Sequence, residues 1–236
     1  MAKQFQAFSS KIRKLLIYVL ALIILVPFLF IGVLRWINPP ITSFMLQHVL
    51  FSEIPLQYNW VPSQKISKHL AIAAVASEDQ RFPKHYGFDW HEIQLALHDK
   101  AKGKSLRGAS TITQQVAKNI FLWGGKSYLR KIIEAYFSGV IELCWSKSRI
   151  LEVYLNIAEM GPGIYGVQAA SRHYYNKDAW ELGLQEATRL IAVLPSPKTY
   201  KVNPPSAYVV KRANQIQRQI QLLGGFNYLS PSKGTE

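Results

Sequence analysis

Two adjacent carboxylates, Glu78 and Asp79, stand just behind an apolar run, HLAIAAVA at residues 69–76. A carboxylate that is half sheltered at the end of such a run can act as a general base and remove a proton from a reacting hydroxyl. The plainer interpretation is a helix-terminal acid that pairs with Arg81. Both interpretations stay open here, because a single acid does not identify a site.

A further carboxylate, Glu134, lies in the segment LRKIIEAYFSGVIE. If this segment is a helix, Arg130 and Lys131 lie four and three residues before Glu134 and on the same face. An ordinary ion pair is then the simplest explanation. A second acid of a reaction centre is the alternative.

The stretch between these acids, RGASTITQQVAKN at residues 107–119, carries more hydrogen-bonding capacity than a helix needs for solubility. Gly108 and Ala109 would let a ligand approach a helix N-terminus, where free N–H groups and the helix dipole favour an anion. Lys126 could add a further charge. The sequence therefore predicts a cradle for phosphate and sugar hydroxyls, with a capped helix and a solvated polar face as the alternative. The polar residues of the stretch are Ser110, Thr111, Thr113, Gln114, Gln115, Lys118 and Asn119.

Helices must position these groups, because apolar residues recur at helical spacing through most of the chain. No run alternates long enough to predict a sheet, so the expected fold class is mainly α. Thr111 and Gln114 form a capping-box pattern, Ser206 is expected to cap the last helix, and Gly224 and Gly225 should stop it. The expected helices span 66–78, 110–122, 127–144, 147–159, 166–175, 183–194 and the region after 206.

A hydrophobic run at residues 15–34 contains no charged residue and matches the length that a helix needs to cross a bilayer. The basic residues before it, and only Arg35 closely after it, predict a cytoplasmic N-terminus and an exported remainder. A cleaved signal peptide is the alternative, but the run is longer than a usual signal core. The expected parts are a cytoplasmic tail at 1–14, a transmembrane anchor at 15–35, a membrane-proximal segment at 36–60 and one domain at 61–236.

The charge and the cysteine content of the chain limit the kinds of partner and of fold that it can have. The chain has 28 Lys and Arg against 14 Asp and Glu, and the region after residue 35 holds all of the acids yet remains basic. A basic domain beside a membrane favours an anionic partner such as a lipid-linked phosphate, although solubility alone is the alternative. Nucleic acid is not expected, since no CxxC pair, helix-turn-helix signature or RNP motif occurs. The single Cys144 excludes an intrachain disulfide framework.

Five segments resemble, in order and spacing, the motifs of the peptidoglycan glycosyltransferases. The match runs from about Ala71 to Pro205, and the short chain with one anchor looks like the monofunctional members of that family. The resemblance implies a lysozyme-like, mainly α domain preceded by one transmembrane helix. The segments are EDQRFPKHYGFDW, RGASTITQQVAKNIFLW, RKIIEAYFSGVIE, KSRILEVYLNIAEMGPGIYGVQAA and EATRLIAVLPSPKTYKVNPP.

The resemblance also implies an activity and roles. A growing lipid-linked glycan chain would be transferred with inversion onto the 4-hydroxyl of lipid II, releasing undecaprenyl pyrophosphate. Glu78 matches the family's general base and Glu134 its second essential acid. The implied binding positions for the donor's sugars and pyrophosphate are Ser110, Thr111, Gln114, Gln115, Lys118, Asn119, Lys126 and Arg130.

The implied setting is the periplasmic face of the inner membrane, with the bilayer and other cell-wall synthesis proteins as partners. No cofactor is expected to bind tightly, although a divalent ion such as Mg²⁺ could assist the departure of pyrophosphate. Two positions depart from the family pattern: Ala109 replaces a common glycine, and Leu95 stands where relatives often have a basic residue. Lys100, Lys102 and Lys104 are nearby candidates to replace that charge.

Three other interpretations remain to be tested. A muramidase or lytic transglycosylase would share the fold and a catalytic glutamate, but its soluble substrate needs no phosphate cradle. A membrane-tethered module that binds anionic lipid or cell wall would need neither acid. His85 and His91 flank Asp89, yet no HExxH or similar spacing occurs, so packing or a hydrogen bond to Asp89 is favoured over metal ligation and no metal site is predicted.

Overall fold

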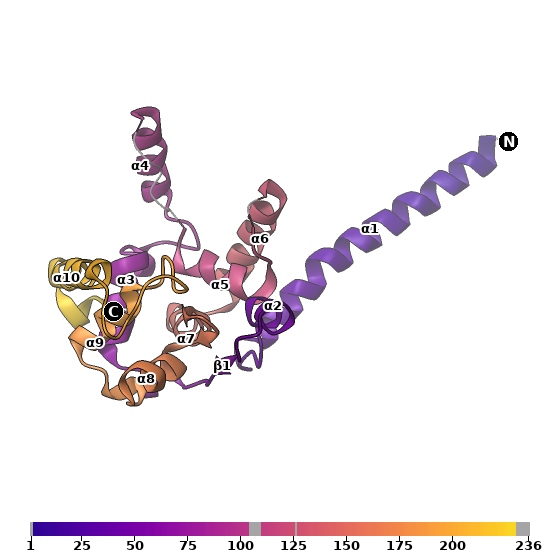
Figure 1. The fold of residues 1–236 in the computed structure, drawn as a ribbon. Coiled ribbons are helices and arrows are strands. Elements are labelled where there is room, and N and C mark those ends of the chain that lie inside the picture. The colour runs from indigo at the N-terminus through magenta and orange to yellow at the C-terminus, as the bar shows by residue number, and fades with distance from the viewer. Residues whose placement is uncertain (1, 104–109, 126, 230–236) are drawn as a thin grey trace, which may run out of the picture.

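The computed structural model describes residues 2–103, 110–125 and 127–229, and it confirms a mainly α fold. A long first helix, α1 (Ala2–Val33), projects from a body of shorter helices (Figure 1). Within it, residues 13–33 are long and apolar enough to cross a membrane. This agrees with the predicted anchor, and Pro27 lies inside the helix.

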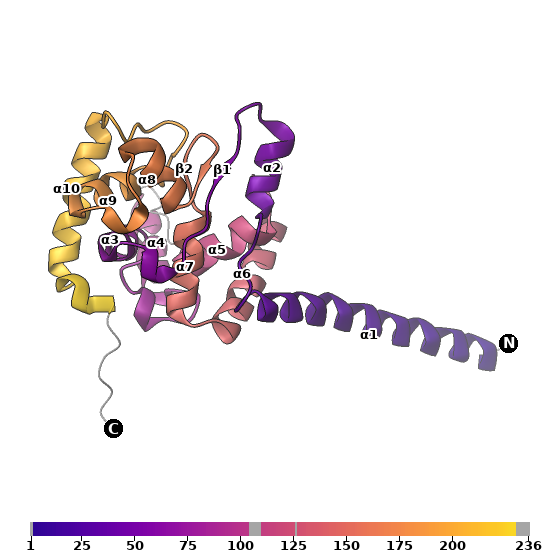
Figure 2. The same cartoon turned by 90° about the horizontal axis from the view of Figure 1, so that it is seen from below.

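Helix α3 (Lys68–Glu78) lies at the centre of one half of the body, beside α9 (Leu184–Ala192) and α10 (Ala207–Leu222) (Figure 2). Ser67 caps its N-terminus by accepting from the backbone N–H of His69. Because α3 is apolar on nearly every side, it is stable only when neighbours enclose it. Glu78 is its last residue, so the burial of this helix fixes the place of that carboxylate. Its buried residues are Leu70, Ile72, Ala73, Ala74, Val75 and Ala76.

The other half is built on α5 (Ile112–Phe121), which packs against α6 (Tyr128–Cys144) and α7 (Lys147–Ile157). The predicted capping box is confirmed, since Thr111 and Gln114 satisfy each other's backbone N–H groups. Ser127 and Ser146 cap α6 and α7 by accepting from the backbone N–H groups of Arg130 and Arg149. Local sequence thus sets where these three helices begin.

The end of α1 is attached to the helical body by side chains from around the start of α7. Trp145 donates its indole N–H to the carbonyl oxygen of Ile31 at 2.8 Å. Arg149 donates to the carbonyl oxygens of Leu34 and Ile37 at 2.9 and 3.1 Å. A guanidinium at the carboxyl end of a helix meets orphan carbonyls and the negative end of the dipole. The anchor is therefore held at its junction with the domain.

Two helices were missed by the sequence analysis. Helix α2 (Ser43–Phe51) lies within the segment predicted only as membrane-proximal, and Thr42 caps it. Its apolar residues do not form one stripe, so periodicity gave no signal. Helix α4 (Trp90–Ala101) begins at Asp89, whose carboxylate accepts from two backbone N–H groups. It stands out from the body (Figure 1) and exposes Leu95.

A small sheet was also missed. It has the order β1 (Gln57–Tyr58), β3 (Ile164–Tyr165), β2 (Glu159–Gly161), with β1 parallel and β2 antiparallel to β3. Strands of two and three residues are too short to show an alternating pattern. The helix predicted over 147–159 is wrong at its end, because α7 stops at Ile157 and Glu159 begins β2.

Strands β2 and β3 are linked by a turn at Pro162 and Gly163. Gly163 has a φ of +74°, and a Cβ there would come within 2.8 Å of the carbonyl oxygen of Pro55. Only glycine fits both conditions. The turn brings β3 beside β1 and so ties the segment after the anchor to the domain.

The remaining elements complete the body. Helix α8 (Val167–Tyr175) follows the sheet, and α10 begins after Ser206 as predicted. Gly224, just after α10, has a φ of +88°, in keeping with its predicted role as a stop. The short 3₁₀ segments are η1 (Ser63–Lys65), η2 (Phe82–Lys84), η3 (Ala179–Glu181) and η4 (Gly225–Leu229).

Candidate active site

Glu78 faces a cavity and is held only by neutral donors among the residues that the structure describes. The hydroxyl of Ser77 donates to its Oε1 at 2.8 Å, and the side-chain amide of Gln115 donates to its Oε2 at 3.2 Å. Arg81, the predicted alternative partner, instead contacts Asp89 at 3.2 Å. Each oxygen of Glu78 therefore keeps a lone pair that can receive a proton.

Asp79, the neighbouring acid, has a different task. Its carboxylate is buried and accepts from His85 Nε2 at 2.8 Å and from the backbone N–H of Ile112 at 3.0 Å. Ile112 is the first residue of α5, so Asp79 satisfies an otherwise free N–H at the positive end of that helix. One acid of the pair joins α3 to α5, and the other is left available for chemistry.

Glu78 lines a cavity beside the N-cap of α5, and Gln115 lines a second cavity along that helix. The first, of about 360 Å³, is lined by Glu78, Ser110, Thr111, Glu92 and neighbouring polar residues. The second, of about 230 Å³, is lined by Gln115, Lys118 and Asn119 with Phe44 and Tyr165. Because Gln115 donates to Glu78, the carboxylate lies where the two cavities approach each other.

The orientation of Gln115 is fixed from α7. The phenol of Tyr154 donates to the amide oxygen of Gln115 at 3.2 Å, which leaves the amide N–H₂ group to face Glu78. Burial, with smaller contributions from Glu78 and Asp79, raises the pKa of Tyr154 well above its usual value. The phenol therefore remains a donor over the range in which proteins work.

Glu134 is buried, unlike Glu78, and it is paired with two cations. Arg130 donates to its Oε2 at 3.0 Å, and the ammonium of Lys131 donates to its Oε1. The predicted ion pair at helical spacing is thus confirmed. Lys131 also lies 3.5 Å from the hydroxyl of Ser110, which links this network to the cavity that holds Glu78.

Lys118 adds a cation that has no ion pair among the described residues. It is half-buried, and its ammonium lies 5.5 Å from the ring centre of Phe44. Burial lowers its pKa most, while Glu134 raises it and Arg130 and Lys131 lower it further. A sheltered ammonium without a carboxylate partner is favourable for binding an anion.

The other predicted residues fall into three groups. Thr111 and Gln114 are buried in the capping box, and the hydroxyl of Thr111 also donates to the carbonyl oxygen of Gly87 at 2.6 Å. Ser110 is exposed at the cavity of Glu78, and Asn119 lines the cavity of Lys118. Lys126 lies outside the described residues, as do Gly108, Ala109 and Lys104. Substrate contact at these positions stays a prediction.

The sequence predicted packing or a hydrogen bond to Asp89 for His85 and His91. The backbone N–H of His91 donates to Asp89 at 3.0 Å, whereas the ring of His85 is buried and bonds to Asp79. Asp79, His85 and Asp89 do offer ligand atoms within 4.8 Å of one another. Both carboxylates already accept backbone N–H groups, at Ile112 and at the start of α4, and Arg81 also binds Asp89. These donors explain the cluster as a structural junction.

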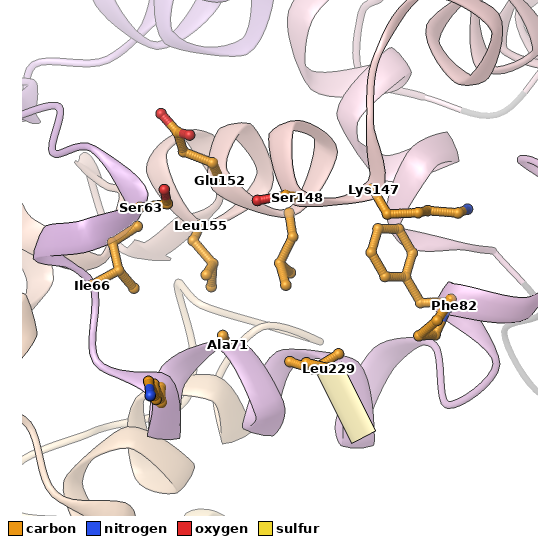
Figure 3. Close-up of a pocket in the computed structure, with 12 residues that line it drawn as sticks. Ser63, Ile66, Ala71, Phe82, Lys147, Ser148, Glu152, Leu155 and Leu229 are labelled. Atoms are coloured by element: carbon orange, nitrogen blue, oxygen red, sulfur yellow. The ribbon is translucent and has the colours of Figure 1, made fainter. Parts of the chain in front are cut away.

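A separate cavity of about 260 Å³ lies between α3 and α7 (Figure 3). Apolar side chains such as Ala71, Phe82 and Leu155 form much of its wall. It shares no lining residue with the cavities of Glu78 and Lys118. It is therefore not a part of the site at Glu78.

Sequence reasoning missed three residues of the site, Ser77, Lys131 and Arg212. Lys131 was noted only as a partner of Glu134, although its spacing from that acid was a usable signal. Arg212, on α10, donates to the carbonyl oxygen and hydroxyl of Ser77 at 3.2 and 3.1 Å. No local pattern indicates a contact between residues so far apart in the chain.

Comparison with known proteins agrees with this geometry. Residues 47–221 match the family model described as Transglycosylase. The chain is 54% identical over 196 residues to the biosynthetic peptidoglycan transglycosylase of Pasteurella multocida (strain Pm70), covering 80% of each chain. It is 52% identical over 202 residues to the protein of that name in Pseudomonas entomophila (strain L48), covering 84% of this chain and 86% of the relative. On this match, and with its helical fold, the chain belongs to the transglycosylase family.

Proposed function

We propose that this protein is a peptidoglycan glycosyltransferase that polymerises glycan strands at a membrane surface. The strongest support is the contrast between the surroundings of Glu78 and those of Lys118. Among the described residues, Glu78 accepts only from neutral donors at one cavity, and Lys118 has no acidic ion-pair partner at the other. A base beside an anion site is what transfer from a sugar pyrophosphate to a hydroxyl requires.

The proposed donor is the growing glycan chain on undecaprenyl pyrophosphate, and the proposed acceptor is lipid II. The acceptor 4-hydroxyl attacks the anomeric carbon, and its proton passes to Glu78. The bond from that carbon to the pyrophosphate oxygen breaks, and its electron pair leaves with the pyrophosphate. The new bond has inverted configuration, as expected for a single displacement.

The leaving pyrophosphate carries negative charge and needs cations more than it needs a proton. Lys118, Arg130 and Lys131 are the proposed binding groups, with Glu134 holding the last two in place. A divalent cation such as Mg²⁺ would supply further charge neutralisation at the phosphate oxygens. Among the described residues, the carboxylate that lines the cavity of Lys118 is Glu159, which also pairs with Lys198 at 3.6 Å.

The proposed location is the inner membrane, with α1 as a single-pass anchor, the N-terminus in the cytoplasm and the helical domain in the periplasm. This rests on the length and apolarity of residues 13–33 and on the basic residues before them. Other cell-wall synthesis proteins remain proposed partners.

The deciding experiment follows labelled lipid II in vesicles with the wild type and with Glu78→Gln, with and without Mg²⁺. Long glycan strands from the wild type and none from the variant support the proposal. Cleavage of preformed glycan without strand growth would favour a lytic enzyme instead. Equal activity of wild type and variant would remove Glu78 from the role of base.

A further inference from the structure

We propose that Arg212 is a positioning residue for the reaction, and that it acts on Glu78 through the hydroxyl of Ser77. This inference rests on the proposed function, because it assumes that Glu78 is the base. It assigns a role to α10, a helix that contributes no predicted site residue.

The direction of the hydrogen bonds follows from the chemistry of the three groups. A guanidinium only donates, so Arg212 fills a lone pair of the Ser77 hydroxyl, at 3.1 Å. That hydroxyl has one hydrogen, and the carboxylate of Glu78, at 2.8 Å, only accepts. Arg212 thus fixes the hydroxyl in the orientation that donates to Glu78.

The same contact also locates the end of α3. Arg212 donates to the carbonyl oxygen of Ser77 at 3.2 Å, one residue before the helix ends at Glu78. Bonds to both polar oxygens of Ser77 hold its backbone and its side chain together. Helices α3 and α10 pack against each other, so the arginine reaches Ser77 from a rigid neighbour.

Placing a neutral hydroxyl between the cation and the carboxylate has a functional consequence. A guanidinium bonded directly to Glu78 would occupy the lone pairs that are needed to accept the proton. Through Ser77, the carboxylate is oriented while each of its oxygens keeps capacity for the acceptor's proton. Arg212 thereby acts on the geometry of the base without blocking it.

The test measures kcat and KM for lipid II polymerisation by the full-length protein in vesicles. We expect Arg212→Met to lower kcat by about 10- to 100-fold, the loss that follows when a reacting group is poorly oriented, with little change in KM. Arg212→Lys should recover part of the rate, since an ammonium can also donate to Ser77. Arg218→Met, an exposed arginine on the same helix, is the matched control and should leave kcat unchanged.

Ser77→Ala separates positioning from a purely structural role. It removes the hydroxyl and keeps the carbonyl contact with Arg212, so it should lower kcat without lowering the unfolding temperature. The double variant of Ser77→Ala and Arg212→Met should be no slower than the slower single variant, because both changes break one connection. Additive losses, or full activity of Ser77→Ala, would overturn the inference.

The test of Arg212 and the test of Glu78 as the base can fail independently of each other. If Glu78→Gln is inactive and Arg212→Met is fully active, the role of Arg212 fails and the base assignment stands. If Glu78→Gln is as active as the wild type, the base assignment itself fails, whatever Arg212 does.

Discussion

Glu78 and Glu134 are both carboxylates of the candidate site, yet their surroundings are opposite. Glu134 is buried and bonded to two cations from its own helix. Glu78 is half-buried and bonded to a hydroxyl and an amide. Cationic donors tie Glu134 into its helix, whereas each oxygen of Glu78 has a neutral donor and the side chain lines a cavity. The difference in partners, more than the residue type, separates an organising acid from a base.

The largest expected effect tests the base directly. Glu78→Gln keeps the shape of the side chain and removes its ability to accept a proton, so kcat for polymerisation should fall by about 10²- to 10⁴-fold. The free energy of unfolding should change by less than about 0.5 kcal/mol, because the partners of Glu78 are neutral. Rate assays and thermal unfolding check both parts, and a large loss of stability would contradict the contrast with Glu134.

The second effect tests the organising acid. Glu134→Gln leaves Arg130 and Lys131 without their anion, so we expect the free energy of unfolding to fall by about 1–3 kcal/mol. The exposed Lys131 should contribute the smaller share of this loss. The value of kcat/KM should also fall, by about 10-fold or more, because the cations lose their positions. Thermal unfolding and polymerisation assays measure the two losses. An unchanged unfolding temperature would show that the ion pairs do not hold α6 in place.

A third test concerns Lys118, the cation that lines the second cavity. Because burial lowers the pKa of Lys118, the ammonium loses its proton at a lower pH than an ordinary lysine. Bound pyrophosphate favours the charged form, so its affinity should be constant below that pKa and should fall as pH rises through it. Inhibition by inorganic pyrophosphate, measured against pH, reports this slope.

Lys118→Arg provides the control for that titration. Arginine stays charged over the whole pH range. The fall in pyrophosphate affinity that comes from deprotonation of Lys118 should therefore be absent in this variant. Titration of pyrophosphate itself affects both proteins equally. Identical pH profiles for the wild type and the variant would exclude Lys118 as the anion's partner.

The smallest expected effect tests the second support of Glu78. Tyr154→Phe removes the hydrogen bond that orients Gln115, and we expect kcat to fall by about 3- to 10-fold with KM nearly constant. Burial is preserved, because the phenyl ring still fills the core. If KM rose in the variant while kcat stayed constant, Gln115 would be a substrate-binding residue rather than a support for the base.

Much of the fold was predictable because its signals are local. The predicted caps at Thr111 and Ser206 are confirmed, and the apolar length of residues 13–33 agrees with the predicted anchor. Helix α2 and the three short strands were not predicted, since their patterns are short or uniformly apolar. Their conformation depends on packing and on pairing with distant segments.

The candidate site divides in the same way. The partners of Glu134 lie three and four residues before it, so the sequence by itself determined that pairing through the period of the helix. One donor to Glu78 is its neighbour Ser77 on α3, but the other comes from α5, and Arg212 of α10 holds Ser77. Only the tertiary structure decided that this acid would meet neutral donors, because hydrogen bonds between distant segments form only once packing has brought those segments together.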